Sequence, residues 1–434
     1  MKDKPKVLIV TRGAWDEDKG TSSTLSNLFS DYGSDRIATI YIEARSPKTR
    51  CCDLFFQIPE ISMVKKLFNW RVKIGKRIDT RTEHNQNPND IRHEDKALQY
   101  VRGHRSKLYT WLRELLWSLN LWKTKELKSF INEFNPDVVW LDGSTNVFLD
   151  RLYLYVLRKA EKPGLIYLMD DNYTYKSMVG FHPLYYALHR ITMRKVVKRC
   201  RGVLTISPKM KREFDSIFKV NSTVITKGID YANIDYSQTV IHKPVRLLYM
   251  GQIIYGRDYT LASVIRALDE INKNELAIKL YIYTKNIIPD HLKKVLNESS
   301  SFELKEAVPY NTVPEVIAEN DVLLFMESLN PKYNRDARLS FSTKITDYLA
   351  SSKCIFAVGP DDCAPLEYFH DNDCAIIAHN QEQIKDGLLK LLNAETINNY
   401  SLKAYNVGKS NHDKKTIQNR LYNVINETAN KINN

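Results

Sequence analysis

The feature that most constrains the fold of this chain is a regular alternation of short apolar runs with helical patterns. In the second half the apolar runs fall at 246–250, 278–283, 321–326, 354–358 and 374–378. The first half repeats the pattern, with expected strands near 6–10, 37–42, 137–141, 165–169, 202–206 and 223–226. Short β-rich runs between helices predict parallel sheets with helices on both faces. We therefore expect an α/β chain of two doubly wound, Rossmann-like domains that face a central cleft.

The two halves meet in a polar segment at 230–244, which is the expected linker. We predict an N-terminal domain at 1–238, a C-terminal domain at 239–408, and a last helix at 409–434 that returns to the first domain. Between about 58 and 135 the alternation breaks into a basic, Trp-rich insertion. Ligands of such sheets bind beyond the carboxyl ends of the strands, so candidate residues are sought there.

Composition excludes several classes of protein. The 434 residues are 43% hydrophobic, which is globular and not disordered composition. No run approaches the ~18 apolar residues of a membrane-spanning helix. The six cysteines have neither metal-ligand nor disulfide-scaffold spacing, which favours a reducing cytosol. Two Asp-x-Asp triplets, at 16–18 and 371–373, are short enough to arise by chance, so we expect no metal and no cofactor.

The most informative passage is 339–360. Ser342 is a favourable N-cap, and Thr343 and Lys344 begin the helix that it opens. Free backbone amides beside a cation suit a diphosphate. Asp347, one turn later, is placed to accept hydrogen bonds from vicinal hydroxyls such as those of a ribose. The alternative is an ordinary i,i+3 surface pair between Lys344 and Asp347.

A second passage, 247–259, ends an apolar strand at Gly251 and begins the next helix near Arg257. A glycine lets the backbone approach a ligand, and a guanidinium binds phosphate oxygens bidentately. Gly359 follows a later strand and is a candidate for the sugar or base pocket, although a plain turn is the favoured explanation. Together, Arg257 and Lys344 at one sheet edge describe a diphosphate site.

These passages resemble the GT-B glycosyltransferases, specifically the retaining, family-four type that uses nucleotide-sugar donors. Residues 249–251 followed by Arg257 resemble that family's Y-V-G-R…K-G turn, and 342–350 resemble its P-S-K-x-x-E-Y-M-A helix. Residues 205–207 and 226–230 resemble its I-x-x-S and P-N-G-V-D passages. The resemblance implies an enzyme that transfers a sugar from a nucleotide-sugar, with UDP favoured, to a glycan, lipid-linked or protein acceptor in cell-surface polysaccharide biosynthesis.

The resemblance also implies roles and exposes departures. Arg257 and Lys344 would stabilise the departing diphosphate, and retention would follow from same-face attack. Gln252 stands where the family has an arginine, and Leu339 stands where a first carboxylate would hold the donor sugar. Glu327 and the loop at 330–338 are candidates for that missing carboxylate, although the register of Glu327 does not match the family's motif. A catalytically degenerate homologue that acts as a partner subunit stays an alternative.

Polar residues follow strands of the first half as well. Gly20 and Thr21 open a helix after a long polar loop and are candidates to line the acceptor side of the cleft. Asp170 follows the 165–169 strand, where a carboxylate could orient or deprotonate an acceptor hydroxyl. Asp171 is a candidate acceptor contact. Helix capping is an equally good explanation of this aspartate pair.

The formal charge of +13 suggests an anionic partner. Residues 61–128 contain sixteen Lys and Arg residues and seven carboxylates, and so most of the chain's excess of positive charge. The same segment contains Trp70, Trp111, Trp117 and Trp122. Aromatic side chains beside cations suit the headgroup region of an anionic membrane. We expect a cytoplasmic protein with peripheral contact on the inner face of the cell membrane. The alternative is that 111–119 form an ordinary buried helix stripe. A nucleic-acid-binding protein has only the charge to support it, because no recognised module is present.

Overall fold

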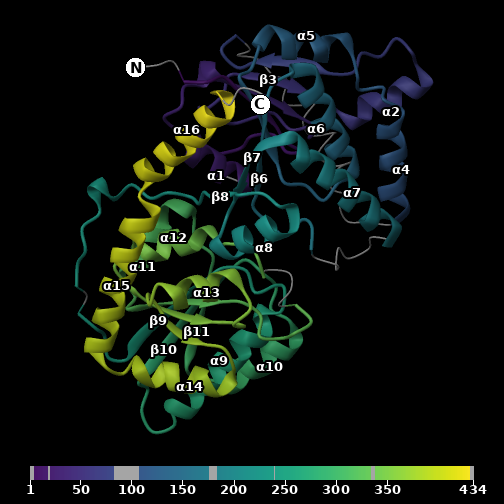
Figure 1. Cartoon of the computed structure of the whole chain (residues 1–434). Helices are drawn as coiled ribbons and strands as arrows, with labels where there is room; N and C mark the ends of the chain where they lie inside the picture. The colour runs from purple at the N-terminus through teal and green to yellow at the C-terminus, as the bar shows by residue number, and fades with distance from the viewer. Residues whose placement is uncertain are drawn as a thin grey trace. The chain divides into compact units, whose positions relative to one another are not determined.

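The computed structural model describes residues 4–17, 20–82, 107–174, 183–238, 240–333 and 338–430. The chain divides into two compact units (Figure 1). Unit 1 comprises Met1–Ile206, Lys211–Thr226 and Ile417–Asn434, and unit 2 comprises Ser207–Met210 and Lys227–Thr416. The predicted domain boundaries at 238 and 408 stay predictions.

Unit 1 is built on an eight-stranded sheet in the order β4-β3-β2-β1-β5-β6-β7-β8. Its strands are β1 (Val7–Val10), β2 (Ile37–Tyr41), β3 (Leu54–Gln57), β4 (Lys76–Asp79), β5 (Val138–Asp142), β6 (Gly164–Leu168), β7 (Cys200–Thr205) and β8 (Thr223–Val224). All neighbours are parallel except β3 and β4. The strand order reverses between β1 and β5, which makes the carboxyl ends of these two strands the expected ligand position.

The helices of unit 1 are α1 (Gly20–Phe29), α2 (Glu60–Phe68), α4 (Lys107–Ser118), α5 (Lys125–Phe134), α6 (Val147–Ala160) and α7 (Pro183–Arg199). Two further helices have residues in both units: α8 (Pro208–Phe218) and α16 (Lys414–Asn430). Local sequence sets the ends of α5, since the Thr124 side chain accepts a hydrogen bond from the Leu127 amide and Asn135 adopts a left-handed C-cap.

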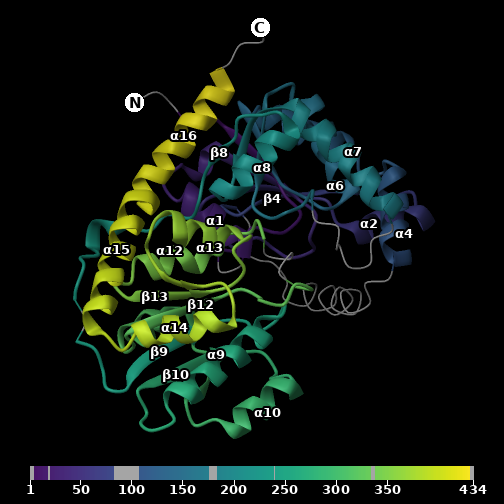
Figure 2. The same cartoon turned by 60° about the horizontal axis from the view of Figure 1, so that its bottom comes forward.

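Unit 2 is built on a six-stranded parallel sheet in the order β11-β10-β9-β12-β13-β14. Its strands are β9 (Val245–Met250), β10 (Ile278–Thr284), β11 (Phe302–Glu306), β12 (Val322–Met326), β13 (Cys354–Val358) and β14 (Ile376–Ala378). Its helices are α9 (Arg257–Ile271), α10 (Asp290–Glu298), α11 (Val313–Ala318), α12 (Thr343–Leu349), α13 (Ala364–Asp371), α14 (Gln381–Lys390) and α15 (Ala394–His412). Helices α9 and α14 lie on one face of the sheet and α12, α13 and α15 on the other (Figures 1 and 2).

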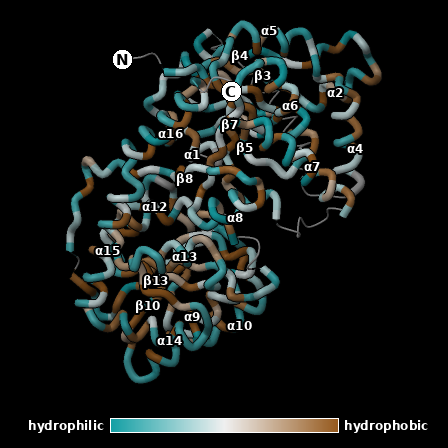
Figure 3. The backbone as a smooth tube through the Cα atoms, viewed as in Figure 1, coloured by the Kyte–Doolittle hydropathy of each residue, from teal (hydrophilic) through white to brown (hydrophobic). Residues whose placement is uncertain are grey.

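The core of each unit consists of its central strands, which are buried along their whole length in β1, β5, β12 and β13. The tube coloured by hydropathy is brown along such strands (Figure 3). Fully buried strands of this kind are typical of parallel sheets covered on both faces. The expected α/β class with two doubly wound sheets is therefore confirmed.

The alternative of an ordinary buried helix stripe at 111–119 is wrong. The buried residues of α4 are Glu114 and Trp117, while Leu112, Leu115 and Leu119 are exposed. Trp117 packs on Trp122, with ring centroids 5.6 Å apart, and both are buried. These two tryptophans are thus part of the core and not of an aromatic surface.

Candidate active site

The candidate donor site lies in unit 2, where the strand order reverses between β9 and β12. Gly251 directly follows β9, and Glu327 directly follows β12. A point of strand-order reversal leaves a crevice at the carboxyl ends of the strands, where ligands of doubly wound sheets bind. The two passages that the sequence singled out therefore meet at this crevice.

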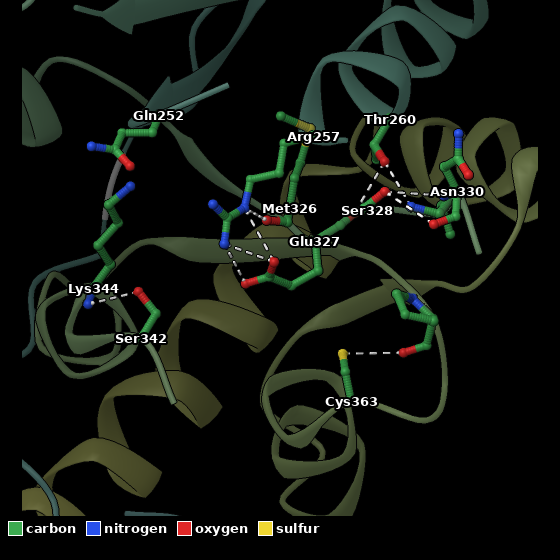
Figure 4. Close-up of polar contacts among 12 residues, drawn as sticks. Gln252, Arg257, Thr260, Met326, Glu327, Ser328, Asn330, Ser342, Lys344 and Cys363 are labelled. Atoms are coloured by element: carbon green, nitrogen blue, oxygen red, sulfur yellow. Dashed lines mark hydrogen bonds and ion pairs between the residues drawn. The ribbon is translucent and has the colours of Figure 1, made fainter. Parts of the chain in front are cut away.

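Arg257 and Glu327 form a bidentate ion pair at this position (Figure 4). The Arg257 Nη2 donates to Glu327 Oε1 at 2.9 Å and Oε2 at 2.7 Å, and its Nε donates to the Met326 carbonyl at 3.1 Å. Burial raises the pKa of Glu327, and the neighbouring guanidinium opposes that rise. The pair holds the Arg257 side chain in one orientation and balances its charge.

Lys344 reaches the same place from α12. Its Nζ donates to the Met250 carbonyl at 2.8 Å, and its side chain extends toward Gln252 (Figure 4). Burial, and to a smaller extent the nearby Arg257 charge, lower the pKa of Lys344 to about 8, while the Glu327 carboxylate opposes that shift. A Cβ atom at position 251 would lie 2.0 Å from this Nζ, so glycine is required there for Lys344 to take its place.

The other residues predicted for the donor site also lie in unit 2 and differ in their exposure and contacts. The Ser342 side chain caps α12 by accepting from the Lys344 amide, and Thr343 and Gln252 are exposed. Asp347 forms an ion pair of 2.8 Å with Lys227. Gly359 packs against Glu327, since a Cβ there would lie 3.1 Å from the Glu327 Cβ. The structure brings Gly251, Arg257, Glu327, Lys344 and Gly359 together. The ligand-binding roles of all these residues stay predictions.

A separate pocket of about 390 Å³ lies in unit 1, where its strand order reverses. Its lining includes Arg12 after β1, Asp142 at the end of β5, Asn146 before α6, and Asp170 after β6. Burial raises the pKa of Asp142, whose Oδ1 accepts from Trp140 Nε1 at 3.1 Å. Alternating cations, carboxylates and amides around such a volume suit a ligand rich in hydroxyl groups.

The residues predicted for the acceptor side do not all line the unit 1 pocket. Asp170 lines the pocket. The Asp171 carboxylate instead accepts from the amides of Tyr173 at 3.2 Å and Thr174 at 2.7 Å, which is the turn-capping alternative. Gly20 and Thr21 begin α1, and their side-chain surroundings lie outside the described residues.

Within the described residues no group of three or more His, Cys, Asp or Glu side chains is arranged to hold a metal ion. None of the helices in the described part of the chain combines the length and the hydropathy that a membrane span requires. None of the six cysteines, all of which lie in the described ranges, forms a disulfide.

Residues 84–233 match the family model of Glycosyltransferase Family 4. A solved glycosyltransferase from Rickettsia africae superposes with a TM-score of 0.60 at 13% identity, over 99% of this chain and 100% of that one. The chain has the fold of the GT-B glycosyltransferases. The GT-B resemblance expected from the sequence is thereby confirmed, and the family match together with the fold supports a transferase.

Two further GT-B structures show the same likeness. The lipopolysaccharide outer core galactosyltransferase WaaB has a TM-score of 0.58 at 10% identity, over 97% of this chain and 99% of that one. The pneumococcal O-GlcNAc transferase GtfA, in complex with UDP and GlcNAc, has a TM-score of 0.50 at 13% identity, over 70% of this chain and 60% of that one. No curated protein matches the sequence.

Three features of the GT-B site were missed by sequence reasoning. The ion pair between Arg257 and Glu327 joins residues 70 positions apart, and no periodicity indicates such a pair. The partner of Asp347, Lys227, lies in a passage that was noted only for its family resemblance. Arg12 lines the unit 1 pocket and lies two residues after the end of β1. Its position just beyond the carboxyl end of a strand could have indicated this place.

Proposed function

We propose that this GT-B chain transfers a sugar from a nucleotide-sugar donor, a UDP-sugar in the first instance, to a hydroxyl group of a glycan, lipid-linked or protein acceptor. The observation that carries the proposal is the partly buried Lys344 beside Arg257 at the strand-order reversal of unit 2. An ammonium group that is largely removed from water and forms no ion pair among the described residues is costly, and an anionic ligand would offset that cost.

The proposed chemistry is stabilisation of the leaving group. The departing diphosphate develops negative charge, and preorganised cations in a partly buried site lower the energy of that transition state. Because Glu327 already balances Arg257, Lys344 supplies the net positive charge. The Arg257 Nη1, which has no hydrogen-bond partner among the described residues, is left to contact a phosphate oxygen. We propose that the two cations serve without a metal ion, and that the sugar is transferred with retention.

The acceptor is assigned to the unit 1 pocket as part of the same proposal. Asp170 lines it and would accept a hydrogen bond from the acceptor hydroxyl. The UDP and GlcNAc bound to GtfA support a UDP-sugar donor, and the lipopolysaccharide role in the name of WaaB supports surface-glycan synthesis. A cytoplasmic location with peripheral membrane contact completes the proposal.

The test is nucleotide binding and donor hydrolysis with UDP-, GDP- and CMP-sugars, each with and without EDTA. We expect one nucleotide to raise the melting temperature of the wild-type chain and Lys344→Ala to abolish the shift. Lys385→Ala, which removes an exposed lysine of the same unit, is the matched control. If no nucleotide shifts stability and Lys344→Ala changes nothing, the enzyme proposal fails.

A catalytically degenerate partner subunit is the second candidate. The observation in its favour is that two predicted ligand-binding side chains already have partners within the protein. Arg257 is paired with Glu327, and Asp347 is paired with Lys227, so a bound donor would have to compete with these ion pairs. Nucleotide binding that depends on Lys344, with no turnover of any donor, would favour this candidate over the enzyme.

A further inference from the structure

Two helices of unit 1 carry apolar stripes that are open to solvent. On α2 the exposed apolar positions are Ile61, Val64, Leu67 and Phe68, which recur at i, i+3, i+6 and i+7. Leu112 and Leu115 on α4 and Leu119 just after its end are exposed as well, at i, i+3 and i+7. A helix normally buries a stripe of this kind against a core, so two uncovered stripes indicate a binding surface.

The two helices lie side by side. The Glu60 carboxylate at the start of α2 accepts hydrogen bonds from Arg113 Nε and, at 2.7 Å, from Trp117 Nε1 of α4. Both views show α2 next to α4 (Figures 1 and 2). Phe68 and Trp70 are 88% and 78% exposed, the most open large side chains of this region. The α2–α4 surface is defined here as Ile61, Val64, Leu67, Phe68, Trp70, Leu112, Leu115 and Leu119.

Cations flank the α2 part of this surface. Residues 61–77 contain six Lys and Arg residues and no carboxylate. Lys65 and Lys73 are exposed, and the Arg71 guanidinium lies 5.5 Å from the centre of the Trp70 ring. Exposed aromatic and aliphatic side chains interleaved with lysine and arginine are typical of helices that lie in the headgroup region of a bilayer. Cores of protein–protein interfaces are instead depleted in lysine.

We propose that the α2–α4 surface docks on an anionic lipid bilayer, with Phe68 and Trp70 inserted among the headgroups and Lys65, Arg71 and Lys73 paired with lipid phosphates. Charge complementarity commits the proposal to a membrane and not to a protein partner. The surface would bring the chain to a lipid-linked acceptor, and in that respect the inference rests on the proposed function. Vesicle binding needs no sugar transfer, so the two proposals can fail separately.

The first experiment is co-flotation of the full chain with vesicles of phosphatidylcholine, with and without phosphatidylglycerol. Binding is expected only to the anionic vesicles, and it should weaken as salt is raised because headgroup attraction is screened. Phe68→Ser with Trp70→Ser should weaken binding by about tenfold or more, since buried apolar area is lost. Lys65→Gln with Lys73→Gln should weaken it by about tenfold. The control is Val240→Ser, at a valine of unit 2 that is 88% exposed.

The second experiment locates Trp70 itself. Of the six tryptophans, Trp15, Trp117, Trp122 and Trp140 are buried and Trp111 is half-buried, so bromine-labelled anionic lipids should quench the emission of the exposed Trp70 most strongly. Trp70→Phe should remove most of the quenching while leaving flotation nearly unchanged. Each variant is checked by its melting temperature, because exposed positions should not alter folding.

Three outcomes would overturn the docking proposal. The first is that the wild-type chain stays unbound at low salt, and the second is that the Phe68 and Trp70 substitutions leave flotation unchanged. The third is that the chain is a dimer in solution, that these substitutions dissociate it, and that vesicles bind neither form, which would make the surface an interface between two copies.

Discussion

Replacing the buried lysine of the donor site should make the chain more stable and less able to bind nucleotide. Lys344 has its pKa lowered from 10.5 to about 8, mainly by burial. A shift of that size corresponds to about 3 kcal/mol, at about 1.36 kcal/mol per pKa unit. Because the side chain keeps some contact with water and donates a hydrogen bond to Met250, we expect Lys344→Met to recover only about 1–2 kcal/mol at pH 7.

The pH dependence gives this prediction its sign. Below pH 8 the lysine is charged in both the folded and the unfolded chain, so the full cost of burying the charge is present. Between pH 8 and 10.5 the folded chain releases the proton and the unfolded chain retains it, so the stability of the wild type rises with pH. The advantage of Lys344→Met should therefore shrink across that window.

The assay is urea unfolding at pH 7 and at pH 9.5, with and without UDP. Saturating nucleotide at about a hundredfold excess over its Kd should stabilise the wild type by about 2.7 kcal/mol and the variant by almost nothing. Lys385→Met serves as the control at an exposed lysine. The reasoning is refuted if Lys344→Met is less stable than the wild type at pH 7, or if UDP stabilises both chains equally.

Three further predictions concern other residues of the two units. Glu327→Gln should lower the free energy of unfolding by about 2–4 kcal/mol, because it leaves the partly buried Arg257 without its counter-charge; an unchanged urea midpoint would contradict this. Gly251→Ala should weaken UDP binding by about tenfold or more in calorimetry, since the new Cβ would displace the Lys344 Nζ; wild-type affinity would show that Lys344 is not needed there. Asp170→Asn should lower sugar transfer by about a hundredfold and leave donor hydrolysis unchanged; an equal loss in both would place Asp170 outside the acceptor step.

Much of the fold could be predicted because parallel strands are buried on both faces. The run at 354–358 is a continuous apolar segment, and it is strand β13 with the same bounds. Strand β11 was missed because Phe302–Glu306 alternates with Glu and Lys at the edge of the sheet, where one side remains in water. The two alternatives for 111–119 could not be separated from the sequence, because the spacing of its leucines suits a buried stripe although Glu114 and Trp117 make the buried contacts.

The residues of the candidate site could be predicted where the neighbouring sequence alone explains the choice of residue. Gly251 directly follows a strand and Lys344 lies in the first turn of a helix. The structure places these two residues in contact. The ion pair of Arg257 with Glu327 depends on strands that are adjacent in the sheet and distant in the sequence. Such pairings arise from topology, which hydrophobic periodicity alone does not determine.

The route of the chain between its units has a consequence for engineering. Unit 1 takes in the residues after Thr416, where Gln418 donates to the Asn27 carbonyl at 2.9 Å and Thr428 packs against Gly202. The larger segment of unit 2, residues 227–416, is therefore an internal insert in the gene, flanked on both sides by unit 1. A chimera that exchanges donor specificity between relatives has to replace residues 227–416, together with the short unit 2 segment at 207–210, and keep the rest from one parent, because a single crossover point would split unit 1 between two parents.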